Sequence, residues 1–325
     1  MGADSRQISE RIAMKFSVLL CTYNRCELLH RVLESLVKNA DEKPDQIVVV
    51  NGGDERADRL VQSFITAYAH DVKISLIKTV NKNPATSRNV GLPHCKGDII
   101  AITDDDAAVF PNWVSLMKQA HREHPEAGAV GGPVIGVNTD SLVGKVADLI
   151  TFPDWPEPKY VRTIPTVNIS YKREVIDGVG PMDESLFCGE DVDYNWRIQK
   201  LGYKIYFDPR IKVYHTHRPT LTGLLKQHYR YGRAYYLVRR KWRDMYCVYP
   251  HRIRRLRDVL KAGNFIAALL YQPFKTSQRV SSVKSRLGLI PVMFLAGVAW
   301  KGGMLMQAMQ GLENESLSRV SNSVT

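Results

Sequence analysis

Three adjacent carboxylates are the strongest chemical feature of this 325-residue sequence. Asp104, Asp105 and Asp106 directly follow Asp98–Thr103, an apolar run typical of a buried β-strand. Neighbouring carboxylates repel one another, so such a run needs either full solvation or a bound cation. Mg²⁺ and Mn²⁺ bind carboxylate oxygens together with phosphate oxygens. The run therefore predicts a divalent metal site at a strand end, with a solvated acidic turn as the alternative.

A second acidic cluster comes later in the chain, where Glu190 and Asp191 follow a glycine and begin a predicted helix. Asp193 and Arg197 are four residues apart, a spacing at which they pair on one helix face. These carboxylates either complement the positive end of the helix dipole or include a base that deprotonates a hydroxyl. Upstream of the aspartate run, Arg88 lies in a predicted N-capped helix start and is suited to pair with a diphosphate.

Alternating strand and helix signals fill the first 110 residues and predict the elements that position these groups. Continuous apolar strands between helices indicate a largely parallel sheet covered on both faces. Ligands of such sheets bind beyond the carboxyl ends of the strands. The turns after Thr22, Val50 and Thr103 are all such ends, so their polar residues are expected to converge. The predicted strands are Phe16–Thr22, Gln46–Val50, Lys73–Ile77 and Asp98–Thr103, and the predicted helices include Leu28–Leu36 and Leu60–Ala69.

Several short motifs follow one another in a fixed order over residues 15–235. They are Cys21-Thr-Tyr-Asn24, Asn83-x-x-x-x-Arg88-Asn89-x-Gly91, Gly97-Asp98 with Asp104-Asp105-Asp106, Asn168-x-Ser170-x-x-Arg173, Gly189-Glu190-Asp191-Val-Asp193 and His215-x-His217-Arg218. Each motif is weak alone, but their order resembles the family 2 glycosyltransferases. The resemblance implies a GT-A fold, which is a Rossmann-like, mostly parallel α/β sheet flanked by helices that binds a nucleotide-diphospho-sugar.

The resemblance also assigns roles to individual residues. It implies that the aspartate run matches the DxD motif, with Mn²⁺ or Mg²⁺ as the cofactor. Asp191 matches the general base of an inverting displacement. The implied metal ligands are Asp104, Asp106 and His215; the implied donor-nucleotide residues are Thr22, Asn24, Asn51, Arg88, Asp104 and Asp105; and the implied acceptor-side residues are Glu190, Asp193 and Arg197.

Asn51 is a departure from the family pattern. Relatives usually carry an acidic residue after the second strand, where it hydrogen-bonds the uracil ring. The amide of Asn51 offers a different donor pattern, and Asp54 nearby is a candidate substitute. The donor is therefore left open among UDP-, GDP- and dTDP-sugars.

The net charge of +12 is concentrated in the C-terminal part of the chain. Between Lys226 and Arg286 stand 16 Lys and Arg residues, interleaved with tyrosines, against only Asp244 and Asp258. Such a segment binds either nucleic acid or an anionic membrane surface. The apolar runs Asn264–Tyr271 and Leu287–Trp300 favour the membrane and argue against nucleic acid. For residues 287–312 three readings stay open: an interfacial or re-entrant helix, packing against the protein's own core or a partner subunit, and a tilted membrane span.

The chain is accordingly divided into a polar tail (1–14), a GT-A catalytic domain (15–225) and a basic helical C-terminal region (226–325) that contacts a membrane or a second subunit. Five cysteines leave one unpaired under any disulfide scheme, and the first 15 residues do not have the pattern of a secretory signal. Both features favour a cytoplasmic protein, peripheral at the inner face of the cell membrane.

The predicted function is transfer of a sugar from a nucleotide-diphosphate donor to a hydroxyl of a lipid-linked or polysaccharide acceptor. One alternative is a sugar nucleotidyltransferase, which shares the α/β plan and an acidic metal site but carries a Gly-rich basic loop after its first strand. The turn Thr22–Cys26 has no such loop. The other alternative is a catalytically reduced protein that binds nucleic acid or an anionic membrane. The intact Asp104–Asp106 run and Asp191 favour the enzyme.

Overall fold

A computed structural model describes residues 14–242, 244–245 and 256–322. The predicted polar tail lies outside the described residues apart from Met14, and so does Cys247. The chain forms two compact units. Unit 1 comprises residues 1–135, 153–184 and 190–215, and unit 2 comprises residues 136–152, 185–189 and 216–325. The division into domains at residues 225 and 226 stays a prediction.

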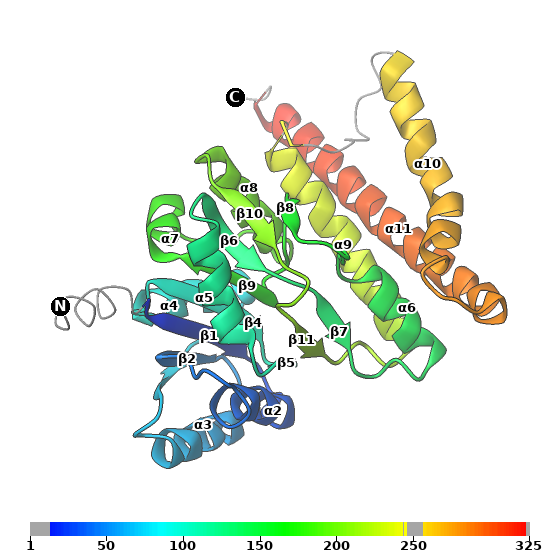
Figure 1. Ribbon diagram of the computed structural model, residues 1–325. Coiled ribbons are helices and arrows are strands. Elements are labelled where there is room, and N and C mark those ends of the chain that lie inside the picture. The colour runs from blue at the N-terminus through cyan, green and yellow to red at the C-terminus, as the bar shows by residue number, and fades with distance from the viewer. Residues whose placement is uncertain (1–13, 243, 246–255, 323–325) are drawn as a thin grey trace. The chain divides into compact units, whose positions relative to one another are not determined.

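Unit 1 contains an eight-stranded sheet in the order β3-β2-β1-β4-β9-β6-β10-β8 (Figure 1). Parallel pairs join β3, β2, β1 and β4 in turn, and β6 is parallel to β10. Only β9 and β8 run against their neighbours, which confirms the predicted α/β sheet. The strands are β1 (Phe16–Thr22), β2 (Gln46–Asn51), β3 (Lys73–Lys78), β4 (Ile99–Asp104), β6 (Ala127–Gly131), β8 (Lys159–Val161), β9 (Asn168–Lys172) and β10 (Lys204–Phe207).

Helices cover both faces of this sheet. As a result, the side chains of β1, β2 and β4 are buried on both sides of the sheet. On one face, Leu19, Val50 and Ile102 share a core cluster with residues of α4, α7 and α8. On the other face, Phe16 packs edge-to-face on Trp113 of α5, with 5.9 Å between ring centroids. The helices of unit 1 are α2 (Cys26–Val37), α3 (Glu55–Ala67), α4 (Pro84–Gly91), the short 3-10 turn η1 (Leu92–His94), α5 (Trp113–Glu123), α7 (Arg173–Val179) and α8 (Glu190–Lys200).

The four predicted strands are confirmed to within one residue at each end. The helix predicted over Leu60–Ala69 begins earlier, at Glu55, because the Asp54 side chain caps it by accepting a hydrogen bond from the backbone N–H of Arg56. A three-stranded sheet in the order β5-β11-β7 was not predicted. Its strands are only three residues long, too short for a hydrophobic period: β5 (Ala107–Val109), β7 (Val134–Gly136) and β11 (Val213–His215).

Among its described residues, unit 2 contains four helices: α6 (Leu142–Ile150), α9 (Leu221–Lys241), α10 (Leu256–Ser277) and α11 (Val283–Asn322). The side chain of Leu224 on α9 is fully buried in a small core between α6 and α11, which includes Val146, Leu289 and Met293. Two glycines allow α9 and α11 to approach closely. A Cβ on Gly232 would lie 1.8 Å from the Trp300 carbonyl oxygen, and a Cβ on Gly303 would lie 2.0 Å from the Tyr229 carbonyl oxygen.

This crossing makes a testable prediction with a matched control one residue away. In Gly303→Ala, the new methyl group meets the α9 backbone, and we expect a loss of about 1–3 kcal/mol in the free energy of unfolding. Nothing lies within 4 Å of a Cβ on Gly302, so Gly302→Ala is expected to stabilise by about 0.5–1 kcal/mol through helix propensity. Urea unfolding of both variants measures the difference. Equal stability of the two would contradict the close helix contact.

Candidate active site

The carboxyl edge of the parallel strands collects the polar residues that end them. Cys21 stands opposite Asp104, Thr22 opposite Asn51, and Asn51 opposite Lys78. The strand order therefore brings groups far apart in the sequence into one row, as expected for the ligand-binding edge of such a sheet.

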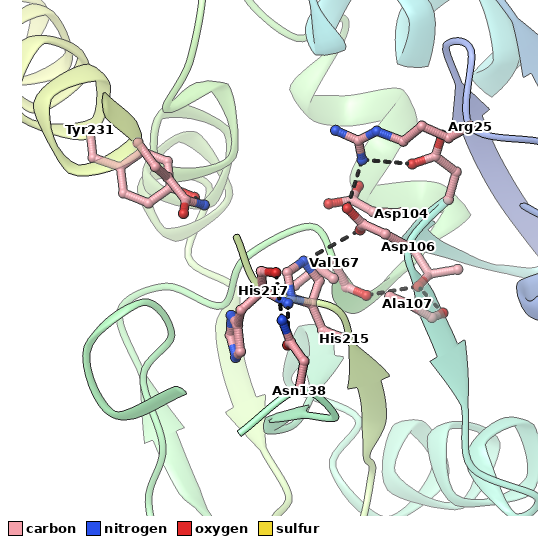
Figure 2. Close-up of polar contacts among 12 residues, drawn as sticks. Arg25, Asp104, Asp106, Ala107, Asn138, Val167, His215, His217 and Tyr231 are labelled. Carbon is pink, nitrogen blue, oxygen red and sulfur yellow. Dashed lines mark hydrogen bonds and ion pairs between the residues drawn. The ribbon is translucent and has the colours of Figure 1, made fainter. Parts of the chain in front are cut away.

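The aspartate run begins at the last residue of β4 and is held by Thr22 at the end of β1 and by Arg25 in the turn that follows (Figure 2). The Thr22 hydroxyl donates to Asp105 over 2.7 Å. Arg25 donates from one nitrogen to both Asp105, at 3.1 Å, and Asp106, at 2.6 Å. Burial, together with the negative charge of Asp106, raises the pKa of Asp105 to about 6 against the opposing effect of Arg25. Part of the repulsion in the acidic run is therefore balanced by an arginine.

The three-stranded sheet places His215 beside the aspartate run. Strand β5 follows Asp106 directly, and antiparallel pairing sets His215 of β11 opposite Ala107. The His215 Nε2 atom lies 3.4 Å from the Asp106 carboxylate (Figure 2). The structure thus brings together two of the three residues predicted as metal ligands, although 109 positions separate them in the chain.

Arg88 connects the aspartate run with the second acidic cluster. Asn83 caps α4 by accepting a hydrogen bond from the backbone N–H of Thr86, at 2.9 Å, and Arg88 follows one turn later. The Arg88 guanidinium is buried, pairs with Asp104 at 3.2 Å and forms a short ion pair with Glu190. Burial by itself lowers the pKa of Arg88, but Glu190 and Asp104 outweigh it and raise the pKa. Glu190 is buried as well, so both partners of this ion pair are shielded from solvent.

Asp191 stands next in α8, in the first turn of the helix. Its carboxylate accepts a hydrogen bond from the backbone N–H of Val192, at 2.8 Å. Burial and then the negative charge of Glu190 raise the pKa of Asp191 to about 7, against the opposing effect of Arg88. A carboxyl group with this pKa exchanges protons near neutral pH, as a general base must.

The predicted pair of Asp193 and Arg197 forms with a distance of 3.0 Å. Arg197 also donates to the carbonyl oxygens of Val179 and Pro181, at 2.9 and 2.8 Å. These bonds tie α8 to the end of α7 and so fix the helix that carries Asp191.

The turns after β1 and β2 are held together by two asparagines. Asn24 has a left-handed backbone, with φ of 55°, and its side chain accepts a hydrogen bond from the Asp54 N–H at 2.9 Å. The Asn51 amide donates to the Asp54 carbonyl oxygen and to Asp58, at 2.9 and 2.8 Å, and accepts from the Gly53 N–H. Asp58 also pairs with Lys78 at 2.7 Å. Asn51 is thus buried, and both hydrogens of its amide are donated within the protein, to Asp54 and Asp58.

The donor set at the aspartate run fits a hard divalent cation in chemical type. Asp104 and Asp106 offer carboxylate oxygens and His215 offers an imidazole nitrogen, a combination that suits Mn²⁺ or Mg²⁺. Within the described part of the chain, no three acidic, histidine or cysteine side chains already stand in a metal-binding arrangement. Arg25 and Arg88 instead supply positive charge to the same carboxylates.

Arg25 contacts the aspartate run although it was not among the predicted site residues. Its position in the turn after a parallel strand, three residues beyond Thr22, was the available signal. Asn168 of the fourth motif turns out to be structural: it is fully buried, accepts from the Trp113 indole N–H at 2.8 Å and donates to two backbone carbonyls.

The comparisons with known proteins agree with this geometry. Residues 17–169 match the family described as Glycosyl transferase family 2, and residues 99–305 match Glycosyl transferase family group 2. The second match covers more than half of the chain. This protein belongs to the family 2 glycosyltransferases.

Individual relatives of this glycosyltransferase include two proteins of Haloferax volcanii. A glucosyl-dolichyl phosphate glucuronosyltransferase is 30% identical over 196 residues, which are 52% of this chain and 56% of that protein. The glycosyltransferase AglE is 26% identical over 227 residues, which are 67% of this chain and 72% of that protein. The match thus spans little more than half the length of the first relative.

Solved structures show the same fold at low sequence identity. A mannosyltransferase of Pyrobaculum calidifontis, in complex with GDP-Man and Mn²⁺, superposes with a TM-score of 0.60 at 16% identity, over 90% of this chain and 87% of that one. GalNAc-T7 with UDP, GalNAc and Mn²⁺ gives a TM-score of 0.55 at 17% identity, over 72% and 49% of the two chains. The glycosyltransferase therefore has the predicted GT-A architecture.

Proposed function

We propose that this glycosyltransferase moves a sugar from a nucleotide-diphosphate donor to a hydroxyl group of a lipid-linked or polysaccharide acceptor, with inversion at the anomeric carbon. One observation carries the proposal: Arg88 pairs with both Asp104 and Glu190, and so joins the aspartate run to the start of α8, where Asp191 stands. This connection supports a single site that combines the proposed donor-binding edge with the proposed base.

In the proposed reaction, the Asp191 carboxylate accepts the proton of the acceptor hydroxyl. The acceptor oxygen then attacks the anomeric carbon from the face opposite the diphosphate, and the bond between that carbon and the diphosphate oxygen breaks. The electron pair leaves with the nucleoside diphosphate, and the attack from the opposite face inverts the configuration. Burial, reinforced by the negative charge of Glu190, maintains the raised pKa of Asp191, while Arg197 and Asp193 hold α8 in place.

A divalent metal is part of the proposal. Asp104 and Asp106 with His215 are the residues that would hold it, and a bound Mn²⁺ or Mg²⁺ supplies positive charge that stabilises the departing diphosphate. The solved relatives with Mn²⁺ and a nucleotide support this assignment. Thr22, Asn24, Asn51 and Asp105 are proposed to shape the pocket for the nucleotide.

A lipid-linked acceptor is the more specific proposal, because one relative is named for transfer to glucosyl-dolichyl phosphate. The basic composition of the C-terminal part agrees with a peripheral position on the inner face of the cell membrane.

The raised pKa of Asp191 leads to a pH dependence whose sign can be stated. The base works only as a carboxylate, so kcat/KM is expected to fall about tenfold per pH unit below the pKa of about 7 and to level off above it. Removing a negative neighbour lowers the pKa, so Glu190→Gln is expected to move this acid limb to lower pH. Initial rates with saturating metal between pH 5 and 9 test both statements. A flat profile through pH 6 would exclude Asp191 as the base.

Thermal unfolding with UDP, GDP or dTDP in the presence of Mn²⁺ tests the donor class. We expect one of the three nucleotides to raise the melting temperature clearly more than the others, since bound ligand stabilises the folded state by mass action. The absence of any shift would count against the donor site.

A further inference from the structure

The helices α10 and α11 expose an unusual amount of apolar surface. Leu270 and Phe274 on α10 are 70% and 61% exposed, and Val283 and Leu287 at the start of α11 are 66% and 67% exposed. Along α10, Ile266, Leu270 and Phe274 recur at intervals of four residues and so lie on one face. Exposed apolar clusters of this kind mark surfaces that bind a partner or a membrane.

Within the α10–α11 segment itself, the charges after Asp258 and before Glu313 are all of one sign. No Asp or Glu occurs between Asp258 and Glu313. Lys275, Arg279 and Lys284 are exposed and flank the turn that joins α10 to α11. An apolar stripe with exposed cations next to it in the same segment complements an anionic lipid surface, which takes apolar side chains at the acyl boundary and cations at the headgroups.

The length of α11 also permits a membrane span, since Val283–Gly311 is the one helix among the described residues that is long and apolar enough. The opposite face of that helix is already occupied within unit 2. Leu289, Met293 and Ala296 are buried, and Gly303 lies against the α9 backbone. A span would carry α9 into the hydrocarbon together with its exposed Lys226 and Arg230, at a high cost in free energy.

Polar contacts along α11 also favour a helix that packs within unit 2 over a membrane span. Arg233 of α9 donates to Gln307 of α11 at 2.9 Å. The Lys301 ammonium lies 3.5 Å from the centre of the Phe265 ring of α10, and burial lowers its pKa. Lys301, the one lysine that interrupts the apolar stretch of α11, thus makes a cation–π contact within the α10–α11 hairpin.

We propose that the α10–α11 hairpin docks in the plane of an anionic lipid bilayer. Leu270, Phe274 and Leu287 enter the acyl boundary, and Lys275, Arg279 and Lys284 bind lipid phosphates. The inference deepens the proposed function by naming the surface and the partner of the membrane contact. It rests on the proposed function only in expecting a membrane acceptor, and it is tested without any sugar transfer.

Vesicle sedimentation of the full chain provides the test. We expect binding to vesicles of phosphatidylcholine with phosphatidylglycerol and little binding to phosphatidylcholine alone. Lys275→Gln with Arg279→Gln is expected to weaken binding about 25-fold, which is about fivefold per cation. Leu270→Gln with Phe274→Gln is expected to weaken it at least about tenfold. The control Leu201→Gln changes an apolar residue of unit 1 that is 52% exposed and is expected to bind like the wild type.

Three results would overturn the inference. The first is equal binding to neutral and anionic vesicles, or unchanged binding of the charge and apolar variants. The second is protein that high salt and alkaline buffer cannot extract from the vesicles, which would indicate a span. The third is a dimer in solution with no vesicle binding, which would assign the surface to a second copy. Hydrolysis of a soluble nucleotide-sugar by the same variants reports separately on the proposed function and is expected to stay at the wild-type rate.

Discussion

Asp191→Asn is expected to lower kcat by about a thousandfold, in the range typical of a lost general base. The asparagine keeps the shape of the side chain and its acceptor for the Val192 N–H, so the start of α8 is preserved. Only the capacity to take a proton is lost. Because donor binding is proposed for the carboxyl edge of the sheet, the affinity for the nucleoside diphosphate is expected to change little.

Steady-state rates together with calorimetric donor binding measure these two effects. Asp177→Asn is a suitable control, since Asp177 is an exposed aspartate on the neighbouring α7, and it is expected to retain wild-type kcat. A loss of donor affinity that matches the loss of rate would show that Asp191 binds the substrate and is not the base.

Asp106→Asn is expected to abolish the metal-dependent part of the activity. The aspartate faces His215 at 3.4 Å and Arg25 at 2.6 Å, so its charge is central to the acidic run. Loss of a carboxylate ligand is expected to weaken Mn²⁺-dependent binding of the nucleoside diphosphate at least about tenfold. Removal of metal with EDTA is expected to lower the wild-type rate to the level of the variant.

Titration of donor affinity against Mn²⁺ concentration distinguishes this role from a structural one. A metal ligand shifts the Mn²⁺ dependence, whereas a structural residue lowers the melting temperature without such a shift. Asp71→Asn serves as the control, because Asp71 is an exposed aspartate whose carboxylate pairs with Lys43. Full activity of Asp106→Asn in EDTA would exclude a metal at this position.

The sheet was predictable because its strands are continuous apolar runs. β1, β2 and β4 are buried on both faces, and burial of both faces leaves a strong signal in the sequence. From the strand ends, the convergence of Thr22, Asn51 and Asp104 followed as a consequence of parallel pairing.

Pairing through short strands was not predictable in the same way. The three residues of β11 carry no period, so the contact of His215 with Asp106 was suggested by resemblance alone and is explained only by the register with β5. Likewise, the sequence does not indicate that Arg88 joins two acidic clusters 86 positions apart, because a buried ion pair depends on tertiary packing.

The hydrogen bonds of Asn51 could not be predicted from its position in the sequence. Its sequence position suggested direct contact with the base, whereas its amide hydrogens are donated to Asp54 and Asp58. For the C-terminal helices, the glycine contact between α9 and α11 was hidden for the same reason: a glycine in a helix says little until its neighbour is known.

Hydrolysis of UDP-, GDP- and dTDP-sugars with Mn²⁺ by the wild type, Asp106→Asn and Asp191→Asn tests the central claim most directly. We expect the wild type to turn over at least one donor, and both variants to be slower by two orders of magnitude or more. No turnover of any donor, or equal turnover by all three proteins, would contradict the assignment of glycosyl transfer to this site.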